Sequence, residues 1–324
     1  MAKNQLLKNA KYNAERKAQD ALIKRDLDRD LILERMYRQS YDRMQAQLDN
    51  YFMRYAKDTG LALAEVKKRA DAMDVQLFAD KAKEAVRIKD FSDETNEWLK
   101  TYNLKMKVSR LELQQAEIEW ELRMLHDEAY QLMDSTRYAE GMAELRRQAG
   151  ILGESVTNPA NRLQGVLDAD FYGKDFSEYV WGRTGLYEKH RSEVFKSLSQ
   201  IYTDMNGYRQ ERNRLMKLYN TTEYETMRLL KTEVARINSE VQLMTWKEQE
   251  FSHFVYVAEL GACSICAHYD GMVIPVDEAK MGLNLYPQHP NCRCSSYAVH
   301  EMKRKDGTDN LEEYRNYEVY DPDY

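Results

Sequence analysis

Residues 33–55 read LERMYRQSYDRMQAQLDNYFMRY, and this stretch decides the fold class. Large apolar and aromatic side chains recur in it every three or four residues, which is the spacing of one face of an α-helix. The residues of that face are Leu33, Tyr37, Tyr41, Met44, Leu48, Tyr51 and Tyr55. The helical pattern extends from about Asn9 to Ala56, and at 1.5 Å per residue it predicts a rod of roughly 70 Å.

Glycine and proline, which interrupt helices, are scarce in the first half of this 324-residue chain. All five prolines lie beyond residue 158, and of thirteen glycines only Gly60 precedes Gly141. Inside a helix, glycine costs about 1 kcal/mol and proline about 3 kcal/mol relative to alanine. We therefore expect long helices in the first half, with shorter ones at Leu61–Ala72 and Val75–Ile88.

A second long helix is expected after Ser92, because Ser92 and the two acids that follow it are typical of a helix N-terminus. Its apolar positions alternate steps of four and three, as in a heptad seam with a polar interruption at Gln115. The seam positions are Leu104, Val108, Leu111, Gln115, Ile118, Leu122, Leu125, Ala129 and Leu132. The seam predicts a helix hairpin within the chain or contact with a partner helix, and an intramolecular core is the commoner use.

The second half changes character twice. Residues 150–165, GILGESVTNPANRLQG, predict a linker, and a helical pattern resumes from Phe176 through Glu248. Within that pattern, Glu233 and Arg236 are expected to form a surface ion pair one helical turn apart. After Trp246 come three short β-type runs, at residues 254–258, 272–274 and 296–299, with an Asp270-Gly271 turn signal between the first two.

These patterns predict a mainly α fold. Long N-terminal helices form a helical arm or hairpin, and a helical domain follows that is closed by a small β-containing, zinc-stabilised module. The expected division is a long-helix domain at 1–150, a linker at 151–165, a domain at 166–300 with a cysteine-rich module at 251–300, and an acidic, tyrosine-rich tail at 301–324.

Five residues in the module have the chemistry of metal ligands. Cys263 and Cys266 form a Cys-x-x-Cys pair, and His289, Cys292 and Cys294 follow after a short interval. Zinc prefers four sulfur or imidazole ligands in a tetrahedron, so five candidates compete for four positions. With no open position expected, the metal would be structural, supplying folding energy to a module too small to hold a core alone.

Three alternatives to a metal site remain open. The four cysteines could be buried reduced thiols, or a disulfide could form after release from the cell. A third alternative is catalysis, with Cys263 or Cys266 as a nucleophile and His268, His289 or His300 as its base. The sequence offers no glycine-rich oxyanion turn and no third orienting group, so we expect no enzymatic activity and no small-molecule substrate.

Charge is unevenly distributed around the net value of −6. Residues 1–25 carry seven basic and two acidic groups, whereas residues 301–324 carry four basic and eight acidic groups. Opposed ends of this kind can contact different partners. No run approaches the eighteen or so apolar residues of a membrane span, and the first thirty residues lack a secretory signal, so we expect a soluble protein made in a reducing cytosol, with no membrane partner.

The second half resembles the phage Mu F-like head morphogenesis proteins, which are minor capsid proteins of tailed phages. The resemblance covers about residues 170–300 and rests on the ordered motifs Trp181-Gly182-Arg183, Thr232-Glu233-Val234-Ala235-Arg236, Cys263-x-x-Cys266-x-x-x-Asp270-Gly271 and Pro287-x-His289-Pro290-x-Cys292-Arg293-Cys294. One departure is Lys231, where the family commonly has arginine. Lysine cannot make a bidentate contact, so a bidentate role of that arginine is not carried over to this chain.

The resemblance implies a non-enzymatic structural role inside the phage head, near the portal vertex, in head assembly and in DNA packaging or ejection. The implied partners are the portal protein and the major capsid or scaffolding protein. The basic residues 1–25 could additionally contact packaged DNA, with an affinity that falls steeply as salt rises. A zinc-containing nucleic-acid binding protein without a virion role is the alternative.

Overall fold

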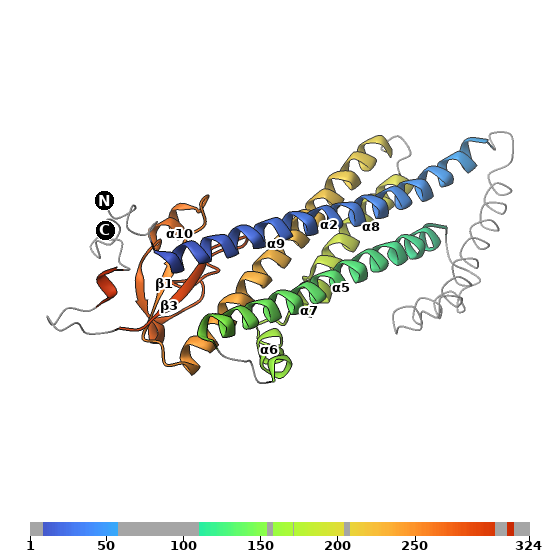
Figure 1. Ribbon diagram of the computed structural model, residues 1–324. Coiled ribbons are helices and arrows are strands. Elements are labelled where there is room, and N and C mark those ends of the chain that lie inside the picture. The colour runs from blue at the N-terminus through green and yellow to red at the C-terminus, as the bar shows by residue number, and fades with distance from the viewer. Residues whose placement is uncertain are drawn as a thin grey trace. The chain divides into compact units, whose positions relative to one another are not determined.

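The computed structural model describes residues 9–57, 110–153, 158–170, 172–203, 208–301 and 310–313. Within them the protein is mainly helical, with one small antiparallel sheet near the C-terminus (Figure 1), which confirms the predicted fold class. The expected helices at Leu61–Ala72 and Val75–Ile88 lie outside the described residues, as do the Ser92 cap and most of the tail at 301–324.

Seven α-helices, two 3-10 turns and three strands make up the described residues. The helices are α2 (Ala10–Lys57), α5 (Arg110–Leu152), α6 (Pro159–Leu167), α7 (Phe176–Trp181), α8 (Leu186–Thr203), α9 (Tyr208–Glu248) and α10 (Ser264–His268), the 3-10 turns are η2 (Val276–Glu278) and η3 (Asn310–Glu313), and the strands are β1 (His253–Val257), β2 (Val273–Pro275) and β3 (Ser295–Val299). The long helix expected from Asn9 to Ala56 is therefore confirmed as α2.

The chain divides into two compact units, each assembled from segments distant in sequence. The first unit contains Met1–Ile32, Gln131–Phe176 and Glu225–Tyr324, and the second contains Leu33–Tyr130 and Ser177–Tyr224. The helices α2, α5 and α9 each contribute residues to both. These units are defined by packing, and the division into domains at 1–150, 166–300 and 301–324 stays a prediction.

The core of the second unit is built by the two predicted helical faces. Ile118, Leu122 and Leu125 of the heptad seam are fully buried and belong to one cluster with Tyr37, Met44 and other residues of α2, α8 and α9. Of the two uses expected for the seam, this packing supports the intramolecular one. The seam positions Leu104 and Val108 lie outside the described residues.

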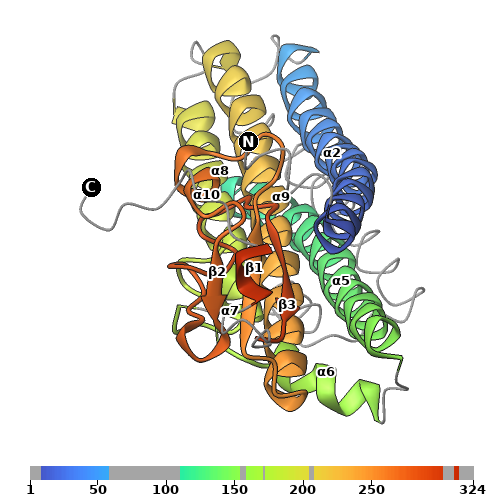
Figure 2. The ribbon, with the colours of Figure 1, turned by 60° about the vertical axis from the view of Figure 1, so that its left-hand side comes forward.

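The sheet belongs to the first unit, and β1 is its central strand, pairing antiparallel with β2 and β3 (Figure 2). Successive side chains of a strand point to opposite faces. Val255 and Val257 pack with Tyr12 of α2 on one face, whereas Phe254 and Tyr256 pack with Trp246 and the cysteines on the other. The three β-type runs of the sequence are thus confirmed as strands, each within about a residue of its expected position.

The Asp270-Gly271 turn is confirmed, although it does not join β1 to β2 directly because α10 lies between them. Gly271 has a φ of 78°, a left-handed conformation that glycine adopts without steric cost. Its N–H donates to the carbonyl of Tyr256, and the Asp270 carboxylate accepts from the N–H of Ala258. The turn therefore ties the end of α10 back to β1.

The helical pattern from Phe176 to Glu248 is divided into α7, α8 and α9. Gly182 lies just after α7, where its N–H donates to the carbonyl of Glu178 over 3.0 Å. A Cβ at this position would lie 2.5 Å from that same oxygen. The glycine of Trp181-Gly182-Arg183 is therefore required by a close backbone approach.

The expectation of a surface ion pair between Glu233 and Arg236 is wrong, because both residues are only 1% exposed. The guanidinium of Arg236 donates to Glu233 and, over 3.0 Å, to the carbonyl of Val166. Arg137 of α5 contacts the same carboxylate, with 3.3 Å between Nε and Oε2. In the first unit α5 and α6 pack over this part of α9 and bury the pair. The i,i+3 spacing of two charged residues does not indicate whether another helix packs over them.

Candidate metal centre

Two segments of the first unit bring the predicted ligands together. Cys263 lies at the N-terminal end of α10 and Cys266 lies inside this helix, whose first turn closes with the N–H of Ala267 bonded to the carbonyl of Cys263. His289 and Cys292 lie in a turn before β3, closed by the N–H of Cys292 bonding to the carbonyl of His289. Cys294 follows immediately before the first residue of β3.

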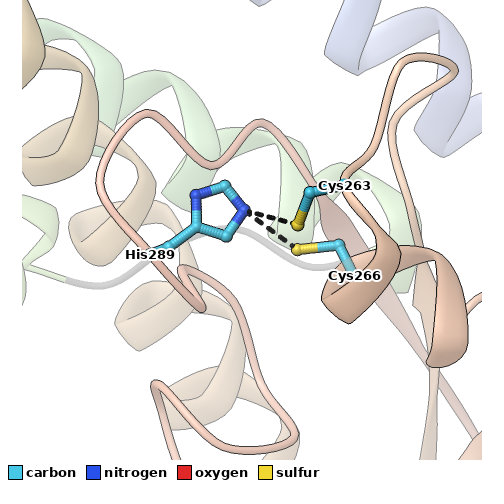
Figure 3. A group of neighbouring side chains, drawn as sticks. All are labelled: Cys263, Cys266 and His289. Carbon is cyan, nitrogen blue, oxygen red and sulfur yellow. Dashed lines mark hydrogen bonds between the residues drawn. The ribbon is translucent and has the colours of Figure 1, made fainter.

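The distances between ligand atoms are those of a shared ion site. The Nε2 of His289 lies 3.2 Å from the sulfur of Cys263 and 3.3 Å from the sulfur of Cys266. Figure 3 draws both contacts as dashed lines. The sulfurs of Cys266 and Cys292 are 3.8 Å apart. Two sulfurs bound to one tetrahedral zinc at about 2.3 Å would be separated by about 3.8 Å.

All five predicted residues enter this cluster, in two overlapping groups. Cys263, Cys266 and His289 form one group, and Cys266, Cys292 and Cys294 form the other, with the ligand atoms within 4.8 Å of one another in each. Cys266 belongs to both groups and is buried, as are Cys292 and Cys294, whereas Cys263 is exposed. The cluster can hold a metal ion.

The orientation of His289 suits a metal ligand. Its Nδ1 lies 2.8 Å from the carbonyl oxygen of Pro290, and because a carbonyl oxygen only accepts, Nδ1 carries the hydrogen. In the neutral ring this leaves the lone pair on Nε2, the atom that points at the sulfurs of Cys263 and Cys266 (Figure 3). Metal-bound histidines commonly fix their tautomer with such a bond from the other ring nitrogen.

The thiols of the cluster are hydrogen-bonded to one another, and the bond between Cys266 and Cys292 raises the pKa of Cys266 while it lowers that of Cys292. Hydrogen bonding from Cys266, together with Cys294, lowers the pKa of the Cys292 thiol. The backbone amide of Cys266 lowers the pKa of Cys263. Because metals bind the thiolate form of cysteine, both effects favour coordination.

The hydroxyl of Tyr256 supports the same interpretation. It is buried, it has no hydrogen-bond partner among the described residues, and Cys294 and Cys266 are close enough to shift its pKa. Burial raises the pKa of Tyr256, so this hydroxyl keeps its proton and remains a donor beside the cluster. A thiolate held by a metal would be a suitable acceptor.

The other two histidines considered as catalytic bases are not in the cluster. The ring of His300 stacks on Phe251 at 4.1 Å between centroids, and the ring of His268 packs edge-on against Tyr269. Within the residues that the structure describes, neither enters a ligand group. The cysteines therefore face one another and His289, which is the arrangement of a ligand set.

Neighbouring helices hold the second ligand segment in place, and the sequence did not predict these contacts. The N–H of Asn291 donates to the hydroxyl of Thr232 on α9 over 3.2 Å, and Arg293 donates to the carbonyl of Lys231 over 2.9 Å. The side chain of Arg293 also forms an ion pair with Asp26 of α2. The motif at residues 232–236 therefore has two contacts: Thr232 bonds to the ligand turn, and Arg236 bonds to α6.

The fold and the site together define a helical protein closed by a small cysteine- and histidine-rich sheet module that can hold a metal. Residues 190–297 match the model of a family described as Phage Mu protein F like protein, which confirms the resemblance over a third of the 324-residue chain. The match covers α9, β1, β2, the first three residues of β3 and all five ligand candidates. It points to a structural protein of phage head morphogenesis, and hence to the virion.

No curated protein and no solved structure matches the chain. Among the described helices, none has a stretch that is long and apolar enough to cross a membrane.

Proposed function

We propose that this chain is a minor head protein that lies inside the phage head near the portal vertex and acts in head assembly and in DNA packaging or ejection. The observation that carries the proposal is the family match over residues 190–297, which spans the complete ligand cluster. The proposed partners are the portal protein and the major capsid or scaffolding protein. The role is structural, with no catalytic residues and no small-molecule substrate.

We further propose that the metal is zinc and that it is structural. Three sulfurs and one imidazole form a common closed zinc site, with no position left for a reacting water. We take Cys263, Cys266 and His289 as three of the ligands, because the imidazole lies within 3.3 Å of both sulfurs, and Cys292 as the fourth, because its sulfur lies 3.8 Å from that of Cys266. Cys294 would then be the fifth, unbound sulfur.

The charges of the module favour a structural role over nucleic-acid recognition. Lys280 and Arg293 are the basic residues between Cys263 and Cys294. Arg293 is buried in its ion pair with Asp26, so Lys280 is the exposed one. A nucleic-acid interface would need a cluster of exposed basic side chains.

The described part of the basic N-terminus is largely committed to contacts within the chain. Arg16 contacts Tyr12 and Asp270, and Arg25 pairs with Glu140. Lys17 and Lys24 are exposed, and Lys3 and Lys8 lie outside the described residues. A contact with packaged DNA would use the exposed basic residues of this segment, and its affinity should fall steeply between low and high salt.

The virion role is tested by co-sedimentation. The full chain, mixed with purified portal rings, should sediment with the rings, and antibodies or mass spectrometry should find it in purified heads. Recovery of the chain only in the unassembled fraction, with salt-dependent binding to duplex DNA, would favour the alternative of a zinc-containing nucleic-acid binding protein.

The zinc centre is tested by elemental analysis of the purified chain and of two histidine variants. His289→Gln should lose bound zinc and melt at a lower temperature, whereas His268→Gln, an exposed histidine on α10 outside both ligand groups, should retain zinc. A wild-type chain without zinc, whose melting temperature is unchanged by a chelator, would refute the metal centre.

A further inference from the structure

Helix α2 contacts the cysteine module at points that lie beside the metal ligands. The hydroxyl of Tyr12 donates to Asp270, four residues beyond Cys266, over 3.0 Å. The carboxylate of Glu15 accepts from the hydroxyl of Ser295, the residue after Cys294, over 2.8 Å. Both ligand-bearing segments of the module are therefore bonded to α2.

The most direct of these contacts is made by Arg293, which lies between two of the candidate ligands. Its Nη2 is 2.7 Å from Oδ2 of Asp26, and the two side chains are 8% and 4% exposed. Its Nη1 donates to the carbonyl of Lys231 on α9. The guanidinium thus joins the backbone between Cys292 and Cys294 to two helices at once.

Asp26 is itself held in place. Its other carboxylate oxygen lies 3.2 Å from Nη1 of Arg29, one turn later on α2, and Arg29 also pairs with Glu140 of α5. A buried carboxylate between two guanidinium groups, on a helix fixed against its neighbours, has little freedom to move. It therefore imposes one position on Arg293 and on the chain that carries Cys292.

We propose that Asp26 is a positioning residue of the metal centre, which holds the Cys292 turn in its metal-binding geometry through Arg293. The inference rests on the metal-binding function proposed above. Asp26 lies far outside residues 190–297, so the α2 contact is a feature that the family match does not include.

The consequence is a coupling between metal binding and the docking of α2. If the docked helix holds the ligands in place, then bound metal must in turn stabilise the docked helix by the same free energy. Partners that hydrogen-bond around a metal site typically change metal affinity by about 10 to 100-fold when they are removed.

The test measures metal affinity by competition with a chromophoric zinc chelator, using the full chain and three variants. Asp26→Asn should weaken zinc binding by about tenfold or more, and Asp26→Glu, which keeps the carboxylate, should recover most of the affinity. Asp30→Asn is the control, one turn later on α2: Asp30 pairs with the side-chain amine of Lys231, whereas Arg293 bonds to the backbone carbonyl of Lys231, which this substitution leaves in place. It should bind zinc as the wild type does.

A second readout separates positioning from plain stabilisation. With cobalt as the probe, Asp26→Asn should alter the thiolate-to-cobalt absorption bands and Asp30→Asn should not. In the wild type, removal of the metal should speed hydrogen exchange at the backbone amides of residues 12–26. This measurement needs no variant, so it tests the coupling between metal binding and α2 even if Asp26→Asn does not fold.

The outcomes distinguish the two proposals. A wild-type chain that binds neither zinc nor cobalt refutes the metal centre itself. A wild type that binds metal, with Asp26→Asn matching Asp30→Asn in affinity and in cobalt spectrum, or with exchange in α2 unchanged by metal, refutes the positioning role alone.

Discussion

The carboxylate of Glu233 is buried between the guanidinium groups of Arg137 and Arg236, and the stability of the fold depends on its charge. Replacing Glu233 by Gln removes the carboxylate that the two guanidinium groups share in a site nearly closed to water, and leaves Arg236 paired with Glu240 and Arg137 with Asp134. Removing one partner of a buried ion pair typically costs about 3–5 kcal/mol. We expect Glu233→Gln to lower the free energy of unfolding by about 3 kcal/mol or more in urea denaturation.

The control for this prediction is Glu248→Gln on the same helix. Glu248 pairs with Arg162, but its side chain is 46% exposed, and exposed pairs contribute about 0–1 kcal/mol. Equal losses of unfolding free energy in the two variants would mean that burial does not determine how much these ion pairs contribute to stability.

Two histidines of the second unit predict a pH dependence of stability. His126 Nε2 and His190 Nδ1 lie 3.1 Å apart among the rings of Tyr37, Tyr187 and Tyr219. Burial lowers the pKa of His126 to about 3 and lowers the pKa of His190 well below its usual value. Both are neutral in the folded protein, so the unfolded chain takes up more protons below its pKa of about 6.5.

Stability should therefore be full above about pH 6.5 and should fall as the pH drops from 6.5 toward 3. For His126 alone the loss is about 1.4 kcal/mol at pH 5.5. Urea denaturation at pH 7.5 and 5.5, with metal removed from both samples, measures it. His126→Leu should show a smaller pH dependence than the wild type, and an unchanged dependence would contradict this account.

At residue scale the sequence predicted the ligands but not their surroundings. The Cys-x-x-Cys spacing and the histidine and cysteines of the second segment sufficed to name all five members of the cluster, because ligand chemistry is local. The ion pair between Asp26 and Arg293 joins residues that are far apart in the chain. A single charged residue at an unremarkable helix position carries no signal of such a contact.

Among the secondary-structure elements, α2 contributes its N-terminal end to the core of the sheet module. Tyr12 is 3% exposed and packs with Val255, Val257, Tyr297 and Val299 on one face of the sheet. Truncating a large buried aromatic side chain costs about 3–5 kcal/mol. Tyr12→Ala should therefore destabilise the first unit by about 3 kcal/mol, measured as a lower midpoint of thermal unfolding.

Tyr138→Ala serves as the control, since Tyr138 of α5 is 45% exposed and surface truncations usually change stability by less than about 0.5 kcal/mol. If both tyrosine variants unfold at the wild-type temperature, α2 is not a structural part of the module.

Helices and strands were predictable where one face is periodic. The stripe beginning at Leu33 and the seam through Ile118, Leu122 and Leu125 became the core of the second unit, since burial on one side leaves a regular pattern. The segment around Glu233 is covered by α5 and α6, so its polar residues are buried although they have the spacing of a surface pair. Periodicity of apolar residues predicts which face of a helix is buried when only one face is covered. It does not predict burial where a helix is surrounded by others.

At the scale of the whole molecule, the two packing units interleave in sequence, so no single cut in the chain separates them. The family match covers residues 190–297, yet the sheet face is completed by Tyr12 and the ligand turn by Asp26, both from α2. The module therefore depends on the N-terminal helix, which links the part of the chain that matches the family to the part that does not.

The central claim is a structural role inside the phage head, and the most direct measurement is a density map of the intact head reconstructed without imposed symmetry at the portal vertex. If the chain has this role, the map should contain density inside the head, next to the portal, into which the sheet module and the long helices of this chain can be fitted. A map with no such density, from heads in which mass spectrometry detects no trace of the chain, would contradict it.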